Sequence, residues 1–469
     1  MKSRFLRTFA LFSTFMMTIP ALAWADDAAQ AAATIDTGDT SWVLISAALV
    51  MLMTLPGLAL FYGGLSRKKN VLSTIMYSFF AMIIISLQWP LWGYSLAFGP
   101  DISHIIGSLD WIGLKSVGLD PNPDYAGTIP QQAFMVFQMM FAVITAALIS
   151  GAFAERMRFP AFIAFLLLWT TFVYDPVAHW VWGVGGWLRN LGALDFAGGT
   201  VVHILSGVSG LVACVVLGKR KGYGSEPMIP HNLPFVVLGA ALLWFGWFGF
   251  NAGSALGANG LAAGAFVVTH LATAAAAFSW VAAEWIHHGK PTTLGAASGV
   301  VAGLVAITPA AGFVAPIPAI LIGLIAGLVC YLAVSVAKAK LHYDDSLDAF
   351  GIHGIGGTWG AIATGLFATT AVNPAGGDGL FYGNPGQLVN QLIAIAVSWG
   401  IAIVGTYIVL KVISLFTKLR ASDEEQDIGL DFTQHGEDAY TDLVSGSTLA
   451  TFAAVPANKA TAGAVKPVV

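Results

Sequence analysis

About eleven apolar stretches, each long enough to cross a lipid bilayer, follow one another along this chain with short polar breaks between them. A transmembrane helix needs about 20 mainly apolar residues. Charged residues make up only 10% of the chain, too few to cover a soluble domain, which carries about 25%. We therefore predict an all-α membrane protein with about eleven transmembrane helices. The predicted spans are 41–65, 71–99, 131–153, 159–182, 197–218, 232–253, 260–286, 293–312, 316–338, 349–372 and 386–416.

The Lys and Arg residues in the breaks predict the orientation of these helices. Basic residues follow every odd-numbered span, beginning with Arg67, Lys68 and Lys69. The intervening breaks hold only Lys115 and Arg189. Because cytoplasmic loops carry the excess of positive charge, the pattern predicts an external N-terminus and a cytoplasmic C-terminus. No basic run indicates binding to nucleic acid.

The two ends of the chain lie outside the predicted bundle. Residues 1–25 have the features of a cleaved signal peptide, namely a basic start, an apolar stretch and small residues at its end. An uncleaved first helix is the alternative. The transmembrane domain is expected at 41–416 and a cytoplasmic tail at 417–445. The Ala- and Thr-rich segment 446–469 is expected to be disordered.

Two similar segments indicate an internal repeat. Asp195 precedes His203 at the start of the fifth span, and Asp348 precedes His353 at the start of the tenth, each within Gly-rich apolar sequence. Because the segments are five spans apart, they run through the membrane in opposite directions. We therefore predict two inverted five-helix repeats plus a final helix, an arrangement that would bring His203 and His353 together near the midplane.

Four histidines fall within the predicted spans, where ionisable groups are retained for a reason. His179 and His270 are expected to form contacts between helices. His203 and His353 differ, because the repeat pairs them. Two neutral imidazoles can share a proton and offer polar edges to a small neutral solute, or they can relay a proton. Two histidines without a carboxylate or thiolate make a poor metal site, so no metal or other cofactor is expected.

Aromatic residues gather near the external ends of several spans. Phe137 and Phe141 are four residues apart on one helix face, Trp182 ends the fourth span, and Phe250 precedes Ser254 at the end of the sixth. Such residues form interfacial belts in many membrane proteins. They can also form a cage, because an aromatic face attracts a small cation by about 0.5–2 kcal/mol. A hydroxyl beside the rings would favour a cation that donates hydrogen bonds.

The sequence supports two roles for Asp195 equally well. Its carboxylate can cap the following helix by accepting the free N–H groups of the first turn. It can also support a cation electrostatically at the external mouth, and one residue can do both.

Long segments of the chain resemble the ammonium transporter (Amt/Mep/Rh) family. The similarity extends from about residue 40 to residue 442, with its motifs in the family's order, and the bacterial Amt branch fits better than the Rh branch. His270 is at a position without a family histidine. The segments that carry the resemblance are Pro56–Gly64, Gly151–Arg156, Asp195–His203, Gly246–Ser254, Asp348–Gly354 and Gly429–Tyr440.

The resemblance implies roles for the external residues. Phe141, Trp182 and Ser254 match the site at which the family recruits ammonium. Asp195 matches the acidic residue that supports this site without touching the ion. Family members are also homotrimers with a pore through each subunit, and for this chain we expect a location in the bacterial inner membrane. Its cytoplasmic tail, matched here by 421–442, binds PII-type signal proteins.

The resemblance also implies a pathway below the recruitment site. Phe137 and Phe250 match the stacked phenyl gate, and His203 and His353 match the twin histidines of the pore. We therefore expect ammonium, and methylammonium as a surrogate, to give up a proton near the gate so that ammonia passes the histidines. Whether the proton also crosses stays open. An ammonium sensor that signals through a PII-type partner is the alternative, and an enzyme is not expected, because no nucleophile, metal or phosphate motif is present.

Overall fold

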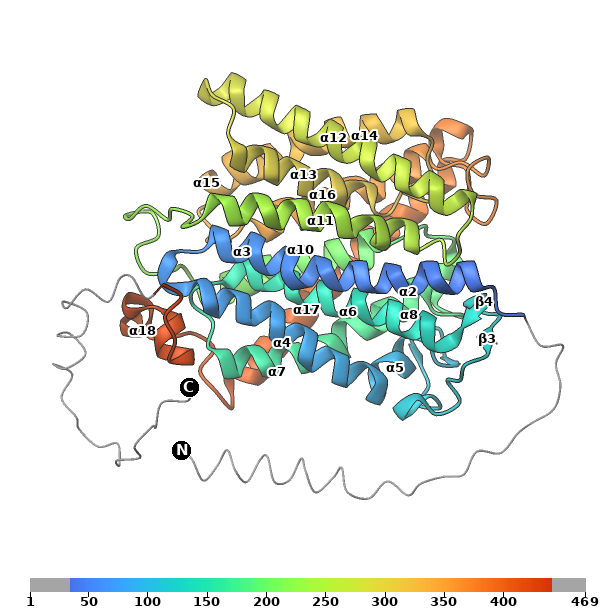
Figure 1. Ribbon diagram of the computed structural model, residues 1–469, viewed down its shortest axis with the longest axis horizontal. Helices are drawn as coiled ribbons and strands as arrows, with labels where there is room; N and C mark the ends of the chain where they lie inside the picture. The colour runs from blue at the N-terminus through green and yellow to red at the C-terminus, as the bar shows by residue number, and fades with distance from the viewer. Residues whose placement is uncertain (1–33, 441–469) are drawn as a thin grey trace, which may run out of the picture. The chain divides into compact units, whose positions relative to one another are not determined.

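The structure is a computed structural model that describes residues 34–440, which are mainly helical (Figure 1). Within these residues, nine helices are long and apolar enough to cross a membrane. Several combine α-helical segments with short π-helical or 3-10 segments, which are labelled η. In chain order the nine comprise α2 (Thr37–Leu52), η1 (Met53–Leu58) and α3 (Ala59–Leu65); η2 (Lys68–Asn70), α4 (Val71–Gln88), η3 (Trp89–Gly93) and α5 (Tyr94–Phe98); α6 (Gln131–Phe153); α7 (Phe159–Trp169), η5 (Thr170–Tyr174), α8 (Asp175–Trp182) and α9 (Trp187–Leu191); η6 (Gly199–Ile204) and α10 (Leu205–Leu217); α11 (Leu233–Gly253); α12 (Gly260–His288); α14 (Pro316–Leu332), η7 (Ala333–Ala337) and α15 (Lys338–Leu341); and α17 (Pro385–Ser414).

The two remaining predicted spans are helical as well. The segment predicted at 293–312 contains α13 (Thr293–Ile307), and the one at 349–372 contains η8 (Phe350–Gly354) and α16 (Ile355–Phe367). The predicted all-α membrane fold is therefore confirmed. The predicted signal peptide and the predicted disordered segment lie outside the described residues.

Short elements connect the helices. Between α5 and α6 lie two antiparallel hairpins, β1 with β2 and β3 with β4. In Figure 1, β3 and β4 lie at one end of the bundle, and α18 lies at the opposite end. We call these the outer and the inner end, and the charge pattern predicts that they are external and cytoplasmic. The short elements are β1 (Asp101–Ile102), β2 (Ile106–Gly107), η4 (Ile112–Leu114), β3 (Pro121–Asn122), β4 (Ala126–Pro130), η9 (Leu380–Tyr382), α18 (Asp423–Ile428) and η10 (Asp431–His435).

Two helices form the centre of the bundle. In α6 and in the helix η6–α10, 78% of the most apolar 18-residue stretch is buried inside the protein, whereas in α17 the buried share is 33%. A helix that is apolar on all sides and surrounded by others needs no polar face. The third and fifth spans therefore form the interior, whereas the last span is mainly peripheral.

Glycines allow the two halves of the chain to approach closely. A Cβ atom on Gly207 of α10 would lie 2.5 Å from the Cα atom of Gly354 in η8, and one on Gly357 would lie 2.9 Å from the Cβ atom of His203. The contacts are reciprocal, because α10 packs on η8 while α16 packs on η6. Small residues at such crossings bring helix backbones together in membranes. Gly207 and Gly357 therefore allow the two histidine-bearing segments to pack closely.

Candidate functional site: an aromatic cavity above a histidine pair

A cavity of about 190 Å³ opens at the outer end of the bundle. Its wall includes Phe141, Trp182 and Ser254, the three residues predicted to form a cage. The rings of Phe141 and Trp182 meet edge to face, with centroids 5.8 Å apart. The Ser254 hydroxyl donates its hydrogen to the carbonyl oxygen of Phe250 at 2.8 Å, so its lone pairs stay free as acceptors. The cavity can therefore offer aromatic surface and an acceptor to a small cation.

The stacked rings beneath the cavity differ from the predicted pair. Phe141 stacks on Phe250, with centroids 4.3 Å apart and planes 20° apart. Phe137 instead meets Phe141 edge-on, with centroids 4.9 Å apart. The prediction that Phe137 stacks on Phe250 is thus replaced by a Phe141–Phe250 stack. The reason is the depth of each ring in the bundle. Because α6 begins at the outer end, Phe137 lies one helical turn nearer that end than Phe141, and Phe141 is the ring at the level of Phe250. All three side chains are buried.

The structure brings the two predicted histidines into contact, although 150 residues separate them. The Nδ1 atoms of His203 and His353 lie 3.3 Å apart, and both residues are buried. His203 is also close to aromatic rings. Its ring stacks on that of Trp247, with centroids 5.3 Å apart, and its centroid lies 6.0 Å from that of the Phe250 ring. Aromatic rings therefore lead from the cavity to the histidine pair.

The geometry of the pair determines where protons can lie. Two facing Nδ1 atoms can bond only if one of them carries a hydrogen and the other accepts it. If both rings are neutral, the second ring carries its hydrogen on Nε2. The Nε2 atom of His203 is buried and has no hydrogen-bond partner among residues 34–440. The pair can therefore present a polar edge to a small solute that donates or accepts a hydrogen bond.

Asp195 caps the π-helical start of the helix that carries His203. One carboxylate oxygen accepts the N–H groups of Gly198 and Gly199 at 2.8 and 2.6 Å. The other accepts the N–H groups of Thr200 and Val201, and also the Thr200 hydroxyl. Its backbone carbonyl accepts the indole N–H of Trp182 at 2.9 Å. The capping role predicted for Asp195 is present, and through Trp182 it is joined to the cavity wall.

The aspartate that corresponds to Asp195 in the second half is Asp345, not the predicted Asp348. Asp345 accepts the N–H groups of Ala349 and Phe350 at the start of η8, at 3.1 and 2.7 Å. Asp348 instead forms an ion pair with Lys338 at 2.6 Å. Spacing explains the difference, because eight residues separate Asp345 from His353, as they separate Asp195 from His203.

The other two predicted membrane histidines lie away from this pathway. His270 is exposed on α12 and stacks on Trp244, with ring centroids 5.2 Å apart. His179 is buried between α8 and α5, where it bonds a backbone carbonyl and an aspartate. Among the described residues, no group of three or more His, Cys, Asp or Glu side chains could hold a metal ion.

Residues 41–440 match the family model described as the Ammonium Transporter Family. The chain belongs to this family. It is 60% identical to a protein named ammonium transporter of Bacillus subtilis over 406 residues, which are 86% of this chain and 99% of the relative. It is 51% identical to a protein of Aquifex aeolicus with the same name, over 87% of this chain and 94% of the relative.

A solved structure of the same fold is that of Saccharomyces cerevisiae Mep2. It is 39% identical to this chain, with a TM-score of 0.78, and the match covers 83% of this chain and 89% of Mep2. Its likeness, together with the spans described above, identifies this family member as a multi-pass helical membrane protein.

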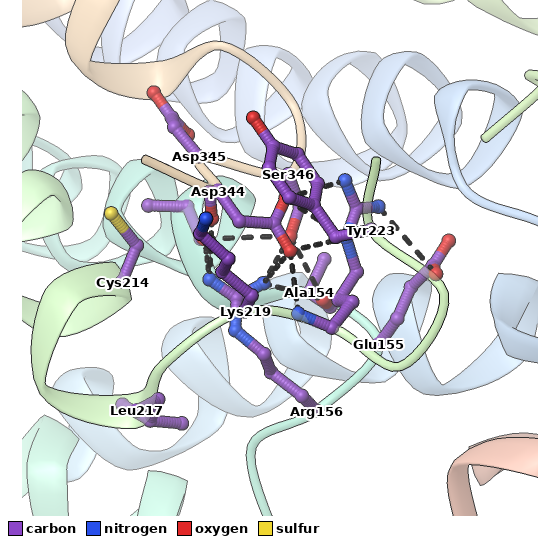
Figure 2. Close-up of polar contacts among 12 residues, drawn as sticks. Ala154, Glu155, Arg156, Cys214, Leu217, Lys219, Tyr223, Asp344, Asp345 and Ser346 are labelled. Atoms are coloured by element: carbon purple, nitrogen blue, oxygen red, sulfur yellow. Dashed lines mark hydrogen bonds and ion pairs between the residues drawn. The ribbon is translucent and has the colours of Figure 1, made fainter. Parts of the chain in front are cut away.

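The inner end of this ammonium transporter family member carries a buried ionic cluster that the sequence did not reveal. Figure 2 shows Arg156, Asp344 and Ser346 gathered between two loops, with Glu155 beside them. The Arg156 guanidinium donates to the Ser346 hydroxyl and to the Asp344 carbonyl, each at 2.5 Å. Arg220 binds the Asp344 carboxylate through Nε and Nη2. Burial would raise the pKa of Asp344, but the bonds from Arg220 and the charges of Arg220 and Arg156 hold this pKa below its ordinary value.

The described part of the tail, up to Tyr440, also packs at the inner end, on the start of α4 and on the loop before α11. The Asp431 carboxylate accepts the N–H groups of Leu72 and Ser73 at 3.0 and 2.7 Å. At the end of the described tail, the Tyr440 hydroxyl bonds His231 at 2.9 Å. The tail therefore contacts a helix of the first half and the loop that joins the two halves.

Proposed function

We propose that this protein carries ammonium across the membrane by recruiting the cation in the outer cavity and passing ammonia along the histidine pair. The observation that carries this proposal is the continuity of the site. Phe141 forms part of the cavity wall and stacks on Phe250, and Phe250 lies 6.0 Å from His203. The two relatives named ammonium transporter favour transport over the alternative of a sensor.

The chemistry of the lining explains why the ion would lose its proton. A charge moved from water into an apolar interior faces an idealised cost of tens of kcal/mol, whereas a neutral polar molecule faces only a few. The Phe141–Phe250 stack offers no charge or carboxylate to replace the water around ammonium. Ammonium can escape this cost by releasing a proton, but potassium cannot. The pathway therefore selects for a cation that has a neutral conjugate base.

The outer cavity suits the charged form of the substrate. Trp182 and Phe141 present ring surface, and the Ser254 hydroxyl presents lone pairs. Ammonium and methylammonium both donate hydrogen bonds and both fit within about 190 Å³. Asp195 supports the site from behind, since its carbonyl holds the Trp182 indole.

The setting of the protein follows from its charge pattern and family. We infer a bacterial inner membrane location, with the outer end external and the tail cytoplasmic. The functional unit is a homotrimer with a pathway through each subunit. The tail at 417–445 is a regulatory segment that a PII-type protein contacts at the cytoplasmic face. Its described part packs at the inner end, on the start of α4 and on His231.

The experiment that tests this function measures flux and current together. The purified protein is reconstituted in proteoliposomes, an inward ammonium gradient is applied, and internal alkalinisation and membrane current are recorded. Ammonium-dependent flux without potassium flux supports the proposal. Absence of flux above protein-free vesicles would refute it. The presence or absence of current then determines whether the proton crosses with ammonia or stays outside.

A substitution at the histidine pair tests the route inside the protein. In His203→Asp, a carboxylate replaces the neutral ring and offsets the cost of a bare cation in the pathway. We expect potassium flux to appear and the preference for ammonium over potassium to fall at least about tenfold, equivalent to about 1.4 kcal/mol. His270→Asn, at an exposed membrane histidine outside the pathway, is the control. A His203→Asp protein that still transports ammonium and excludes potassium would contradict the role of the pair.

A further inference from the structure

His179 occupies a buried position at the outer end, outside the pathway. Its Nδ1 atom lies 3.0 Å from the carbonyl oxygen of Ala97 in α5, and its Nε2 atom lies 2.8 Å from the Asp101 carboxylate of β1. The side chain has no exposed surface, whereas that of Asp101 is 21% exposed. The residue thus joins the end of a membrane helix to an external hairpin.

Both partners of this ring are acceptors, which determines its protonation. A carbonyl oxygen and a carboxylate can each bond only to an N–H group, so both nitrogens of His179 must carry hydrogen. The second carboxylate oxygen of Asp101 accepts the backbone N–H of His104 at 3.1 Å. Burial raises the pKa of Asp101, but hydrogen bonds from His179 and His104 outweigh burial and hold the pKa below its ordinary value. The geometry is therefore that of an imidazolium paired with a carboxylate.

The ion pair packs directly against the turn that follows Trp182. A Cβ atom on Gly183 would lie 2.6 Å from the Nδ1 atom of His179, and one on Gly185 would lie 2.5 Å from the Cβ atom of Asp101. Gly185 also has a φ of +91°, which residues with a side chain rarely adopt. The turn therefore packs in direct contact with the ring and the carboxylate, and there is no room for a side chain at either glycine.

Further bonds fasten the same turn to the hairpin. The indole N–H of Trp180 donates to the carbonyl of Ile105 at 2.6 Å, and the backbone N–H of Trp187 donates to the carbonyl of His104 at 3.3 Å. Within this frame, Trp182 contributes its ring to the cavity and receives a bond from Arg189 on its carbonyl. The position of the cavity wall thus depends on the hairpin.

We propose that the His179–Asp101 pair positions Trp182, so that recruitment of ammonium depends on the protonation of a histidine outside the pathway. His179 is a positioning residue, because it does not line the cavity. The inference rests on the proposed function and adds a response to external pH. When the ring loses a proton, one of its two nitrogens becomes an acceptor that faces an oxygen, so the bond to Ala97 or the bond to Asp101 is lost and the turn beside Trp182 loosens.

The other charged and titratable groups around the ring are few. His104 lies on the same hairpin as Asp101 and approaches its carboxylate at 3.3 Å. Tyr125 accepts the N–H of Val184 in the turn, and Asp124 and Arg189 lie near Tyr125. On the same helix as His179, Asp175 lies one turn deeper and bonds Gln88 instead. Asp101 is therefore the only carboxylate bonded to the ring among the described residues.

Asp101→Asn converts this arrangement into its opposite. The single amide oxygen can still accept the N–H of His104, and the amide NH₂ group then faces Nε2 of His179. That geometry suits a neutral ring, whose Nε2 accepts, and it conflicts with a protonated ring, whose Nε2 donates. The wild-type turn is thus secured by the protonated ring and the variant turn by the neutral ring. A group that only fills space would show no such reversal.

The experiment measures the half-saturating methylammonium concentration for uptake by cells or proteoliposomes. The external pH is varied from about 5.5 to about 8.5, the range in which histidine side chains ordinarily change charge. Methylammonium remains a cation throughout this range. At each pH, the half-saturating concentration of the variant is divided by that of the wild type, so that changes in driving force cancel. We expect this ratio for Asp101→Asn to rise about tenfold or more as the external pH falls across this range. Asp110→Asn is the matched control, because Asp110 is an exposed aspartate of the same loop bonded only to Ser108.

Each outcome gives a distinct conclusion. A ratio for Asp101→Asn that rises toward low pH, with a flat ratio for Asp110→Asn, supports the positioning pair. A flat ratio for Asp101→Asn, with the variant folded and active, overturns it and leaves the proposed function intact. If the wild type takes up neither methylammonium nor ammonium, the proposed function fails and this inference fails with it.

Discussion

In the first half of the chain, Asp195 caps η6 eight residues before His203, and in the second half Asp345 caps η8 eight residues before His353. The two segments differ in what surrounds them. The Asp195 carboxylate accepts from four backbone N–H groups and a hydroxyl, and its carbonyl holds Trp182. Asp345 accepts from two N–H groups and lies near Lys338 and Asp348. The repeat thus brings the two capped, histidine-bearing segments together. The two caps differ in their surroundings, and the aromatic cavity lies at the outer end, where Asp195 holds Trp182.

The largest effect is expected where the two caps are removed. Asp195→Ala leaves several buried donors without an acceptor and should lower the free energy of unfolding by at least about 3 kcal/mol, at about 1 kcal/mol or more for each lost bond. Asp345→Ala loses two bonds and also removes a charge near Asp348, so its effect should be about 1–2 kcal/mol. Thermal melting of both purified variants in detergent checks this order. Equal losses would show that the two caps do not differ.

Burial raises the pKa of both capping aspartates, and for Asp345 the range over which stability should depend on pH can be stated. Burial raises the pKa of Asp345 to about 6, with Lys338 lowering it and Asp348 raising it. An aspartate of the unfolded chain has a pKa of about 3.9. The folded protein therefore binds this proton more tightly than the unfolded chain does. The free energy of unfolding should fall by up to about 3 kcal/mol as pH rises from about 4 to about 6, and it should then stay constant.

Asp345→Asn removes this titration and keeps one acceptor for the cap. Its melting temperature should vary less than that of the wild type between about pH 4 and pH 7. A variant whose melting curve follows the wild type over this range would assign the pH dependence to another group.

A smaller effect is expected at the cavity. Trp182→Leu removes an aromatic face from the wall, and the half-saturating methylammonium concentration should rise about 2- to 30-fold, matching a cation–π energy of about 0.5–2 kcal/mol. Phe137→Leu is the matched control, because Phe137 contacts Phe141 edge-on but does not line the cavity. If both variants weaken uptake equally, Trp182 has no special role at the outer end.

The smallest effect is expected at the hydroxyl. Ser254→Ala removes one acceptor from the cavity and should raise the same concentration about threefold, as for a single hydrogen bond. Ser254→Thr keeps the hydroxyl and should restore most of the loss. Failure of the threonine variant to restore uptake would indicate that space, and not the acceptor, matters at this position.

The helices of this protein could be predicted well because lipid imposes a simple rule. Every backbone group within the bilayer must be bonded internally, so long apolar runs become helices. The eleven predicted segments all contain helix. The pairing of His203 with His353 was also accessible, because two similar segments in opposite orientation predict an inverted repeat.

The details that the sequence did not reveal depend on depth and on tertiary pairing. Phe137 and Phe141 share a helix face, and only the packing of α11 shows that Phe141 meets Phe250. Asp345 and Asp348 both precede η8, and only the bonds to Ala349 and Phe350 distinguish the cap. The cluster of Arg156, Arg220 and Asp344 joins loops far apart in the chain, and no local pattern indicates such a pairing.

The contact of Gly207 with Gly354 has a consequence for how the protein is made. The histidine pair depends on two segments separated by 150 residues, one of them in the tenth span. During synthesis, the first five spans enter the membrane without the surface that completes the pathway. A partly inserted chain therefore has no finished route for a solute, and the membrane stays sealed until the second half arrives and the glycines meet.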